Sequence, residues 1–194
     1  VFFDGVPMSD VPAEKRNIAM VFQQYVLYPN MSVYENLGFY DKSHGLNEVE
    51  VDAKVRSVAS LLGLTSVLNR KPKYLSGGQQ QRVAIARAFA SDPKLIIADE
   101  PTPGMSLDQA LEALRMFREM ADKGKAVILI THDIDLAFEF ADRVAVFYAG
   151  TTVETAPAAD FKAGPDALRH PYSKALWRAL PQNGFQPIEG FQPY

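Results

Sequence analysis

The chain contains no cysteine, no apolar run long enough to cross a membrane and no block of basic residues. Without cysteine it can form neither a disulfide nor an iron–sulfur cluster bound by protein thiolates. The net charge is −3, whereas nucleic-acid-binding domains usually present a basic face. We therefore expect no nucleic-acid partner.

What is present has the composition of a folded globular domain. Apolar residues make up 47% of the 194 residues and charged residues 22%, both ordinary values for such domains. A chain of this length can bury a real core. The patterning predicts strands at 18–22, 126–130 and 143–148, a hairpin turning at Gly150, and helices at 47–62 and 134–140.

Residues 75–92 are predicted to form a helix with an anion-binding start. Ser76 and Gln79 fit a capping box, in which each side chain satisfies a backbone N–H group at the start of the helix. Gly77 and Gly78 carry no side chain where N–H groups are unpaired, so the positive end of the helix dipole is open to a phosphate. An ordinary capped helix explains these residues equally well when they are considered alone.

A short apolar run, residues 95–98, precedes the carboxylates Asp99 and Glu100. Such a run is typical of a strand buried in a parallel sheet, and ligands of open α/β sheets bind at the carboxyl ends of strands. Because side chains alternate along a strand, one carboxylate can hold magnesium through water while the other faces an attacking water. Considered alone, a solvated acidic strand end is the favoured explanation.

Together with three further motifs, these stretches resemble the ATP-binding cassette (ABC) family. Residues 75–79 resemble its signature motif and residues 95–100 its Walker B strand. Gln23 resembles the Q-loop glutamine, Asp108 the D-loop aspartate and His132 the switch histidine. The motifs follow the family's order over most of the chain, and the combination is far more specific than any one of them.

The resemblance implies an α/β fold, a P-loop NTPase-like ABC ATPase core with a mostly parallel sheet and an inserted helical subdomain. Residues 1–23 and 92–155 would form the core, residues 24–91 the helical subdomain with the signature motif, and residues 156–194 a C-terminal tail of importer ATPases. The family's phosphate loop, G-x-x-x-x-G-K-[ST], does not occur in the sequence. We therefore expect a fragment incomplete at its N-terminus and inactive as an ATPase by itself.

The resemblance also implies a site for ATP and Mg²⁺ between two ATPase subunits. Glu100 would act as the base on the attacking water, and His132 would contact the γ-phosphate and stabilise developing charge. The expected catalytic residues are Glu100, His132 and Gln23, the nucleotide-binding residues are Ser76, Gly77, Gly78, Gln79 and Asp108, and the metal-binding residues are Asp99 and Gln23.

The role of Asp108 has a second explanation. The loop between Thr102 and Leu107 is longer than the usual family spacing. Asp108 can therefore equally serve as the N-terminal acid of its own helix, where it favours the helix dipole.

Two segments indicate different transported solutes. Residues 170–181 are similar to a segment that follows the cassette in peptide and nickel importers, whereas residues 25–36 are more similar to sugar importers. We give the first more weight because it lies outside the core machinery. We expect the nucleotide-binding subunit of a peptide or nickel importer, with a sugar importer as the alternative. A single amphipathic helix packed on the sheet domain, with Tyr172, Leu176 and Leu180 on its core face, also explains residues 170–181.

An importer ATPase implies several partners: a second ATPase subunit, transmembrane permease subunits and, indirectly, a solute-binding protein. It would lie peripherally at the cytoplasmic face of the cell membrane. The segment after Gln23 would help to dock the permease, or would be a surface loop whose aromatic residues tuck into the core.

Two other functions compete with that of an importer ATPase. One is a soluble cassette ATPase of DNA repair or translation, which lacks sequence support. The other is a non-catalytic remnant that only docks or dimerises.

Overall fold

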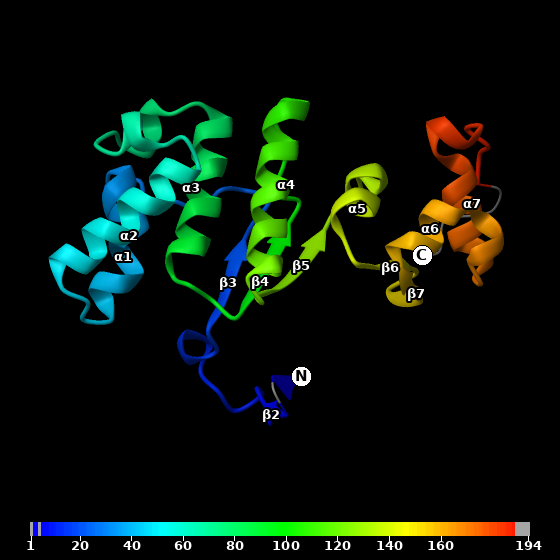
Figure 1. Ribbon diagram of the computed structural model, residues 1–194, viewed down its shortest axis with the longest axis horizontal. Coiled ribbons are helices and arrows are strands. Elements are labelled where there is room, and N and C mark those ends of the chain that lie inside the picture. Colours follow the sequence, from blue (N-terminus) through cyan, green and yellow to red (C-terminus); the bar gives the residue numbers. More distant parts are fainter. Residues whose placement is uncertain (1, 4, 189–194) are drawn as a thin grey trace. The chain divides into compact units, whose positions relative to one another are not determined.

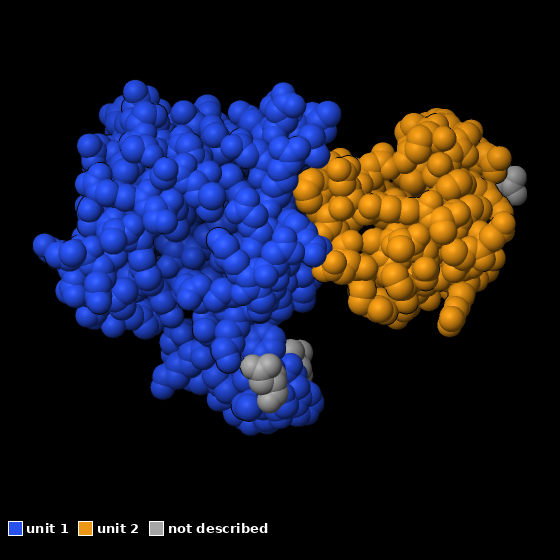
Figure 2. Space-filling view, in the orientation of Figure 1, with its two compact units in different colours: residues 1–132 blue, residues 133–194 orange. Residues whose placement is uncertain are grey.

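The computed structural model describes residues 2, 3 and 5–188. The chain divides into two compact units, residues 1–132 and residues 133–194 (Figure 2). The first unit contains a parallel sheet with helices, and the second contains an antiparallel hairpin with shorter helices. In the described ranges no helix combines the length and the apolar character that crossing a membrane would require.

The sheet of the first unit has three parallel strands in the order β3-β4-β5 (Figure 1). These strands are β3 (Ile18–Val21), β4 (Leu95–Asp99) and β5 (Ala126–Ile130). The central strand β4 is the predicted apolar run, and Ile96 and Ala98 within it are fully buried. The expected parallel sheet is thus confirmed. Because the strands are parallel, the chain leaves all three at the same edge of the sheet.

A small strand pair precedes this sheet. The antiparallel strands β1 (Phe2–Phe3) and β2 (Val6–Pro7) form a two-stranded sheet of their own.

Three helices form the helical part of the first unit, α1 (Val33–Ser43), α2 (Glu48–Leu61) and α3 (Gly77–Ala90). Each begins with a capping box, from Ser32, Asn47 and Ser76 respectively. The three helices pack against one another, and α3 also packs against β3. A fourth helix, α4 (Leu107–Asp122), packs against α3 and β5. Helix α3 therefore connects the helical part with the sheet.

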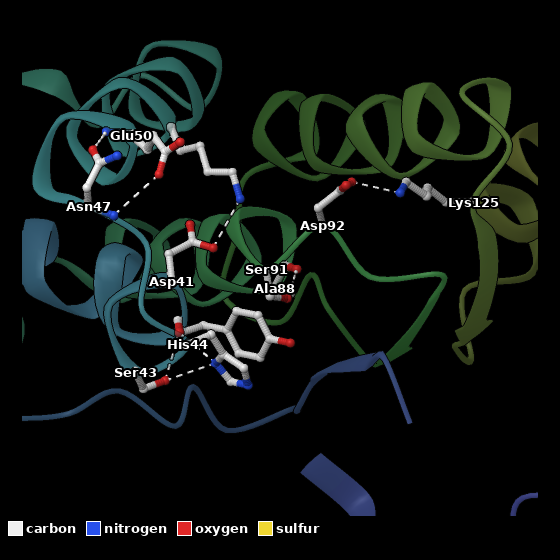
Figure 3. A network of polar contacts seen from close by, with 11 residues as sticks. Asp41, Ser43, His44, Asn47, Glu50, Ala88, Ser91, Asp92 and Lys125 are labelled. Carbon is white, nitrogen blue, oxygen red and sulfur yellow. Dashed lines mark hydrogen bonds and ion pairs between the residues drawn. The ribbon is translucent and has the colours of Figure 1, made fainter. Parts of the chain in front are cut away.

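Polar contacts hold the ends of these elements (Figure 3). The buried carboxylate of Asp41 in α1 pairs with Lys54 in α2, with 3.0 Å between Oδ1 and Nζ. Asp92, just after α3, has a left-handed backbone with φ +46 and pairs with Lys125 at 2.7 Å. The first pair joins α2 to α1, and the second joins the turn after α3 to the residue before β5.

The second unit is built on the hairpin of β6 (Arg143–Tyr148) and β7 (Thr151–Pro157). Its two-residue turn, Ala149 and Gly150, has positive φ at both positions, as a type I′ turn requires. The helices α5 (Ile134–Phe140), α6 (Ala158–Ala163) and α7 (Pro171–Ala179) complete the unit. Leu180 is buried in its core, and Tyr172 and Leu176 pack against that core. The predicted helix thus forms over residues 171–179 and packs in the core of this unit, with Leu180 just past its end.

Glu154 is the buried acid of this unit, with 9% of its surface exposed. Its carboxylate accepts hydrogen bonds from the backbone N–H groups of Arg169, at 2.7 Å, and His170, at 3.1 Å. The buried Ser173 hydroxyl faces the same carboxylate outside ordinary hydrogen-bond geometry. Burial alone would raise the pKa of Glu154, but these donors outweigh it and hold the pKa below its ordinary value.

Candidate functional site

Glu100 directly follows the central strand and lies at the edge where all three parallel strands end. Its backbone is left-handed, with φ +44, and its N–H donates to the Ile130 carbonyl at 2.9 Å. This conformation costs a non-glycine residue about 1–2 kcal/mol, so the surrounding structure must hold it. Such strain often occurs where a side chain has to be aimed for function.

The carboxylate of Glu100 is held by the end of β5. Its Oε1 accepts from the His132 backbone N–H at 2.8 Å and lies 2.7 Å from His132 Nδ1. The Thr131 hydroxyl donates to Oε2 at 3.4 Å. The Glu100 side chain is only 19% exposed, whereas the His132 side chain is 90% exposed. The structure thus brings two predicted catalytic residues into direct contact, with the imidazole presented to solvent.

Strand register explains this contact. Asp99 lies opposite Ile130 in the β4–β5 pair, so the residues that follow each strand meet. Asp99 itself is half-buried at the end of β4. The exposed Gln23 follows β3, whose last residue Val21 pairs with Ala98. The predicted magnesium-binding residues therefore lie at or just after the ends of adjacent strands, at one edge of the sheet.

A magnesium ion would need ligands besides these side chains. Within residues 2, 3 and 5–188, no group of three or more His, Cys, Asp or Glu side chains is arranged to hold a metal ion. Magnesium in nucleotide sites usually takes one or two carboxylates and completes its shell with phosphates and water. One carboxylate and one amide at this edge fit that donor set.

The start of α3 has the predicted capping box. Ser76 Oγ accepts from the Gln79 N–H at 3.3 Å, and Gln79 Oε1 accepts from the Ser76 N–H at 3.0 Å. A side chain at Gly78 would lie 3.2 Å from Gln109 Oε1 of α4. The glycine therefore allows the starts of α3 and α4 to approach each other closely, a packing role that the sequence analysis missed.

Asp108 is exposed and lies in the first turn of α4. That helix is capped by Ser106, whose Oγ accepts from the Gln109 N–H at 3.4 Å, while Gln109 Oε1 accepts from the Ser106 N–H at 3.3 Å. The same Ser-x-x-Gln pattern predicted the cap of α3 and could have predicted this one. The position of Asp108 agrees with its explanation as an acid at a helix N-terminus.

Four exposed side chains of the loop after Gln23 and of α1, three of them aromatic, make up an aromatic patch: Tyr25, Val26, Tyr28 and Phe39. The rings of Tyr28 and Phe39 lie 4.6 Å apart, and the Arg87 guanidinium lies 5.2 Å from the centre of the Tyr28 ring. The fully buried Asn36 holds the loop by bonding both backbone groups of Tyr28, at 2.8 and 3.1 Å. The buried Asn36 side chain thus anchors the loop, whereas the aromatic residues of the loop are exposed to solvent.

The chain is similar to known ATP-binding proteins of transporters. The sequence profile described as ABC transporter matches residues 1–103. The alpha-glucoside transport ATP-binding protein AglK of Rhizobium meliloti (strain 1021) is 45% identical over 77% of this chain and 42% of its own length. The molybdate/tungstate import ATP-binding protein WtpC of Thermococcus kodakarensis is 37% identical over 85% of this chain and 50% of its own length.

A polyamine importer and a solved structure are also similar. The spermidine/putrescine import ATP-binding protein PotA of Roseobacter denitrificans is 38% identical over 85% of this chain and 46% of its own length. A dimeric ATP-binding cassette in a post-hydrolysis state, bound to ADP and Pi, superposes with a TM-score of 0.74 and 29% identity. The match covers 81% of this chain and 72% of that one.

This chain spans half or less of the length of the importer proteins described above. The profile match nevertheless covers more than half of the 194 residues, and the solved cassette shares the fold. With the parallel sheet and the motif residues at its carboxyl edge, these matches show that the chain belongs to the ABC transporter family.

Proposed function

We propose that this chain is the nucleotide-binding part of an ABC importer, in which ATP hydrolysis drives uptake of a solute. The observation that carries the proposal is the contact between Glu100 and His132 at the carboxyl ends of adjacent parallel strands. A partly shielded carboxylate next to an exposed imidazole suits proton transfer beside a charged substrate. The capped start of α3 provides a second, anion-binding element.

In the proposed reaction, Glu100 accepts a proton from the water that attacks the γ-phosphate of ATP. Two N–H contacts from His132 fix the direction of its carboxylate. The exposed ring of His132 would contact the γ-phosphate and stabilise developing negative charge. Asp99 and Gln23 would hold a magnesium ion, which when bound neutralises charge on the phosphates.

The proposed active assembly is a dimer of ATPase subunits. Ser76, Gly77, Gly78 and Gln79 of one subunit would close over the ATP held by the other, and Asp108 would lie beside them. The dimeric cassette with ADP and Pi supports this arrangement. We also propose residues 1–23 and 92–155 as the ATPase core, 24–91 as the helical subdomain and 156–194 as the tail.

For the solute, we propose a sugar in place of a peptide or nickel. The similar proteins are named for alpha-glucosides, trehalose and maltose, molybdate or tungstate, and spermidine or putrescine. These names favour a sugar importer, which residues 25–36 suggested, over a peptide or nickel importer, which residues 170–181 suggested. The second segment is accounted for as a packed helix whose apolar face completes the core of its unit.

The patch of Tyr25, Val26, Tyr28 and Phe39 supports docking of transmembrane permease subunits, because partly exposed aromatic residues are common at protein interfaces. A solute-binding protein would act through those permeases. The chain would then lie peripherally at the cytoplasmic face of the cell membrane.

The test is transport by the intact importer in sealed vesicles. We expect ATP-dependent uptake of a labelled disaccharide of the maltose type, accompanied by phosphate release. Uptake of a labelled oligopeptide or of nickel instead of the disaccharide would show that the chain serves a peptide or nickel importer, as residues 170–181 suggested. An intact protein that neither binds nor hydrolyses ATP would instead identify a remnant that only docks or dimerises.

A further inference from the structure

Gln81 is a buried polar residue on the inner face of α3, with 1% of its surface exposed. Its Nε2 donates to the carbonyl of Pro101 at 2.9 Å, across 20 residues of sequence. Pro101 is also buried, and it directly follows Glu100. One hydrogen bond therefore joins the helix that begins with the signature motif to the residue after the proposed base.

Packing alone does not require glutamine at this position. The Oε1 atom of Gln81 is buried without a hydrogen-bond partner. Burying an unpaired amide oxygen costs about as much as, or more than, the net gain from one hydrogen bond. Methionine has a similar length and no such polar atom, so it should fill the same space at least as well.

The Gln81–Pro101 hydrogen bond lies between two parts of the proposed site, the start of α3 and Glu100. On α3, Gln81 lies one turn after Gly78, where an added side chain would meet Gln109 at the start of α4. On the other side, Glu100 is fixed by the Ile130 carbonyl and by His132. A displacement of the start of α3 would thus be passed through the Gln81 side chain to the backbone beside Glu100.

We propose that Gln81 is a positioning residue that couples the two nucleotide sites of the ATPase dimer. The inference rests on the proposed function, in which Ser76–Gly78 contact the ATP of the opposite subunit while Glu100 serves the ATP of its own. ATP seated against α3 would then improve the alignment of Glu100 in the same subunit. ATP at one site promotes hydrolysis at the other, which gives positive cooperativity.

The first test replaces Gln81 by methionine in the intact importer, with hydrolysis rate measured against ATP concentration. We expect cooperative kinetics in the wild type, a Hill coefficient of about 1 in Gln81→Met, and a folded protein whose melting temperature falls only moderately, because the Pro101 carbonyl loses its donor while the unpaired Gln81 Oε1 is removed. The matched control is Gln80→Met. The Gln80 amide bonds the carbonyl of Leu75 at 3.1 Å, within its own segment, so this variant should keep the wild-type Hill coefficient.

The second test uses Gln81→Glu and a pH series. A protonated carboxyl can donate to the Pro101 carbonyl as the amide does, whereas a carboxylate cannot. The Hill coefficient of this variant relative to the wild type should therefore recover as the pH falls. Gln81→Met should show no such recovery, because it has no group to protonate.

Several outcomes would overturn the coupling role. They are wild-type hydrolysis without cooperativity, an unchanged Hill coefficient in Gln81→Met, and absence of acid recovery in Gln81→Glu. Failure of both variants to fold would assign Gln81 to structure alone. A wild-type protein without ATP hydrolysis would refute the proposed function as well, and so differs from a failure of the coupling alone.

Discussion

Glu100 and His132 lie in direct contact although 32 residues separate them in sequence, and Oε1 of Glu100 meets both the backbone nitrogen and Nδ1 of His132, at 2.8 and 2.7 Å. The pair joins the ends of two neighbouring parallel strands. Because these contacts fix the Glu100 carboxylate, its orientation is already set before a substrate binds. Such preorganisation is a common source of catalytic power.

The first prediction concerns Glu100 as the base. In the intact importer, Glu100→Gln should bind ATP as the wild type does but hydrolyse it slower by a factor on the order of a hundred or more. The amide keeps the shape of the side chain but cannot accept the proton of water. The dimer should remain closed with ATP, as measured by cross-linking between the two ATPase subunits. Steady hydrolysis near the wild-type rate would show that another group is the base.

The second prediction concerns the pair as a unit. His132→Ala should slow hydrolysis by a factor on the order of a hundred, because it removes a donor from the developing charge. Since the two side chains touch, the double variant with Glu100→Gln should lose far less than the product of the single losses. The measurement is a double-mutant cycle on maximal rates. Strictly multiplicative losses would mean that the contact has no part in turnover.

The third prediction concerns the aromatic patch. Asn36→Ala should destabilise the first unit by roughly 2–3 kcal/mol, because buried backbone groups lose their partners. Besides both backbone groups of Tyr28, its amide bonds the carbonyls of Met31 and Ser32 at 3.2 and 2.9 Å. Chemical denaturation gives the stability, and proteolysis near Tyr28 should become faster.

The matched control for Asn36 is Asn30→Ala, an exposed residue of the same loop. It should change stability by less than about 0.5 kcal/mol. If Asn36→Ala were equally neutral, the loop would not depend on that side chain for its anchoring.

The fourth prediction concerns acid stability of the second unit. The pKa of Glu154 is held below its ordinary value of 4.5, so near that pH the unfolded chain binds more protons than the folded one. The contribution of Glu154 to stability is therefore fully present above about pH 4.5 and is lost as the pH falls through the lower, folded pKa.

Urea unfolding of Glu154→Gln and the wild type across this pH range tests the prediction. The wild type should be more stable at pH 7, and the difference should shrink below about pH 4.5. The exposed Glu139 supplies the control, and Glu139→Gln should change the free energy of unfolding at pH 7 by less than about 0.5 kcal/mol. A difference that stayed constant into acid would contradict the role of Glu154.

The sequence by itself determined the local elements. The Ser76 cap, the central strand β4 and the helix α7 were all predictable, because capping and apolar periodicity depend on residues within one or two turns. The order of the motifs also indicated the family. Residues 170–181 misled the solute assignment, because a segment that completes a core carries little information about what is transported.

The tertiary structure alone decided which distant side chains meet. The bond between Gln81 and Pro101, the approach of Gly78 to Gln109 and the pairing of Glu100 with His132 join residues 20 to 32 positions apart. Each depends on strand register and on how α3 and α4 lie together, and shifts of an ångström would break them. Local sequence patterns specify elements, whereas these contacts arise only when the packed core fixes the elements relative to one another.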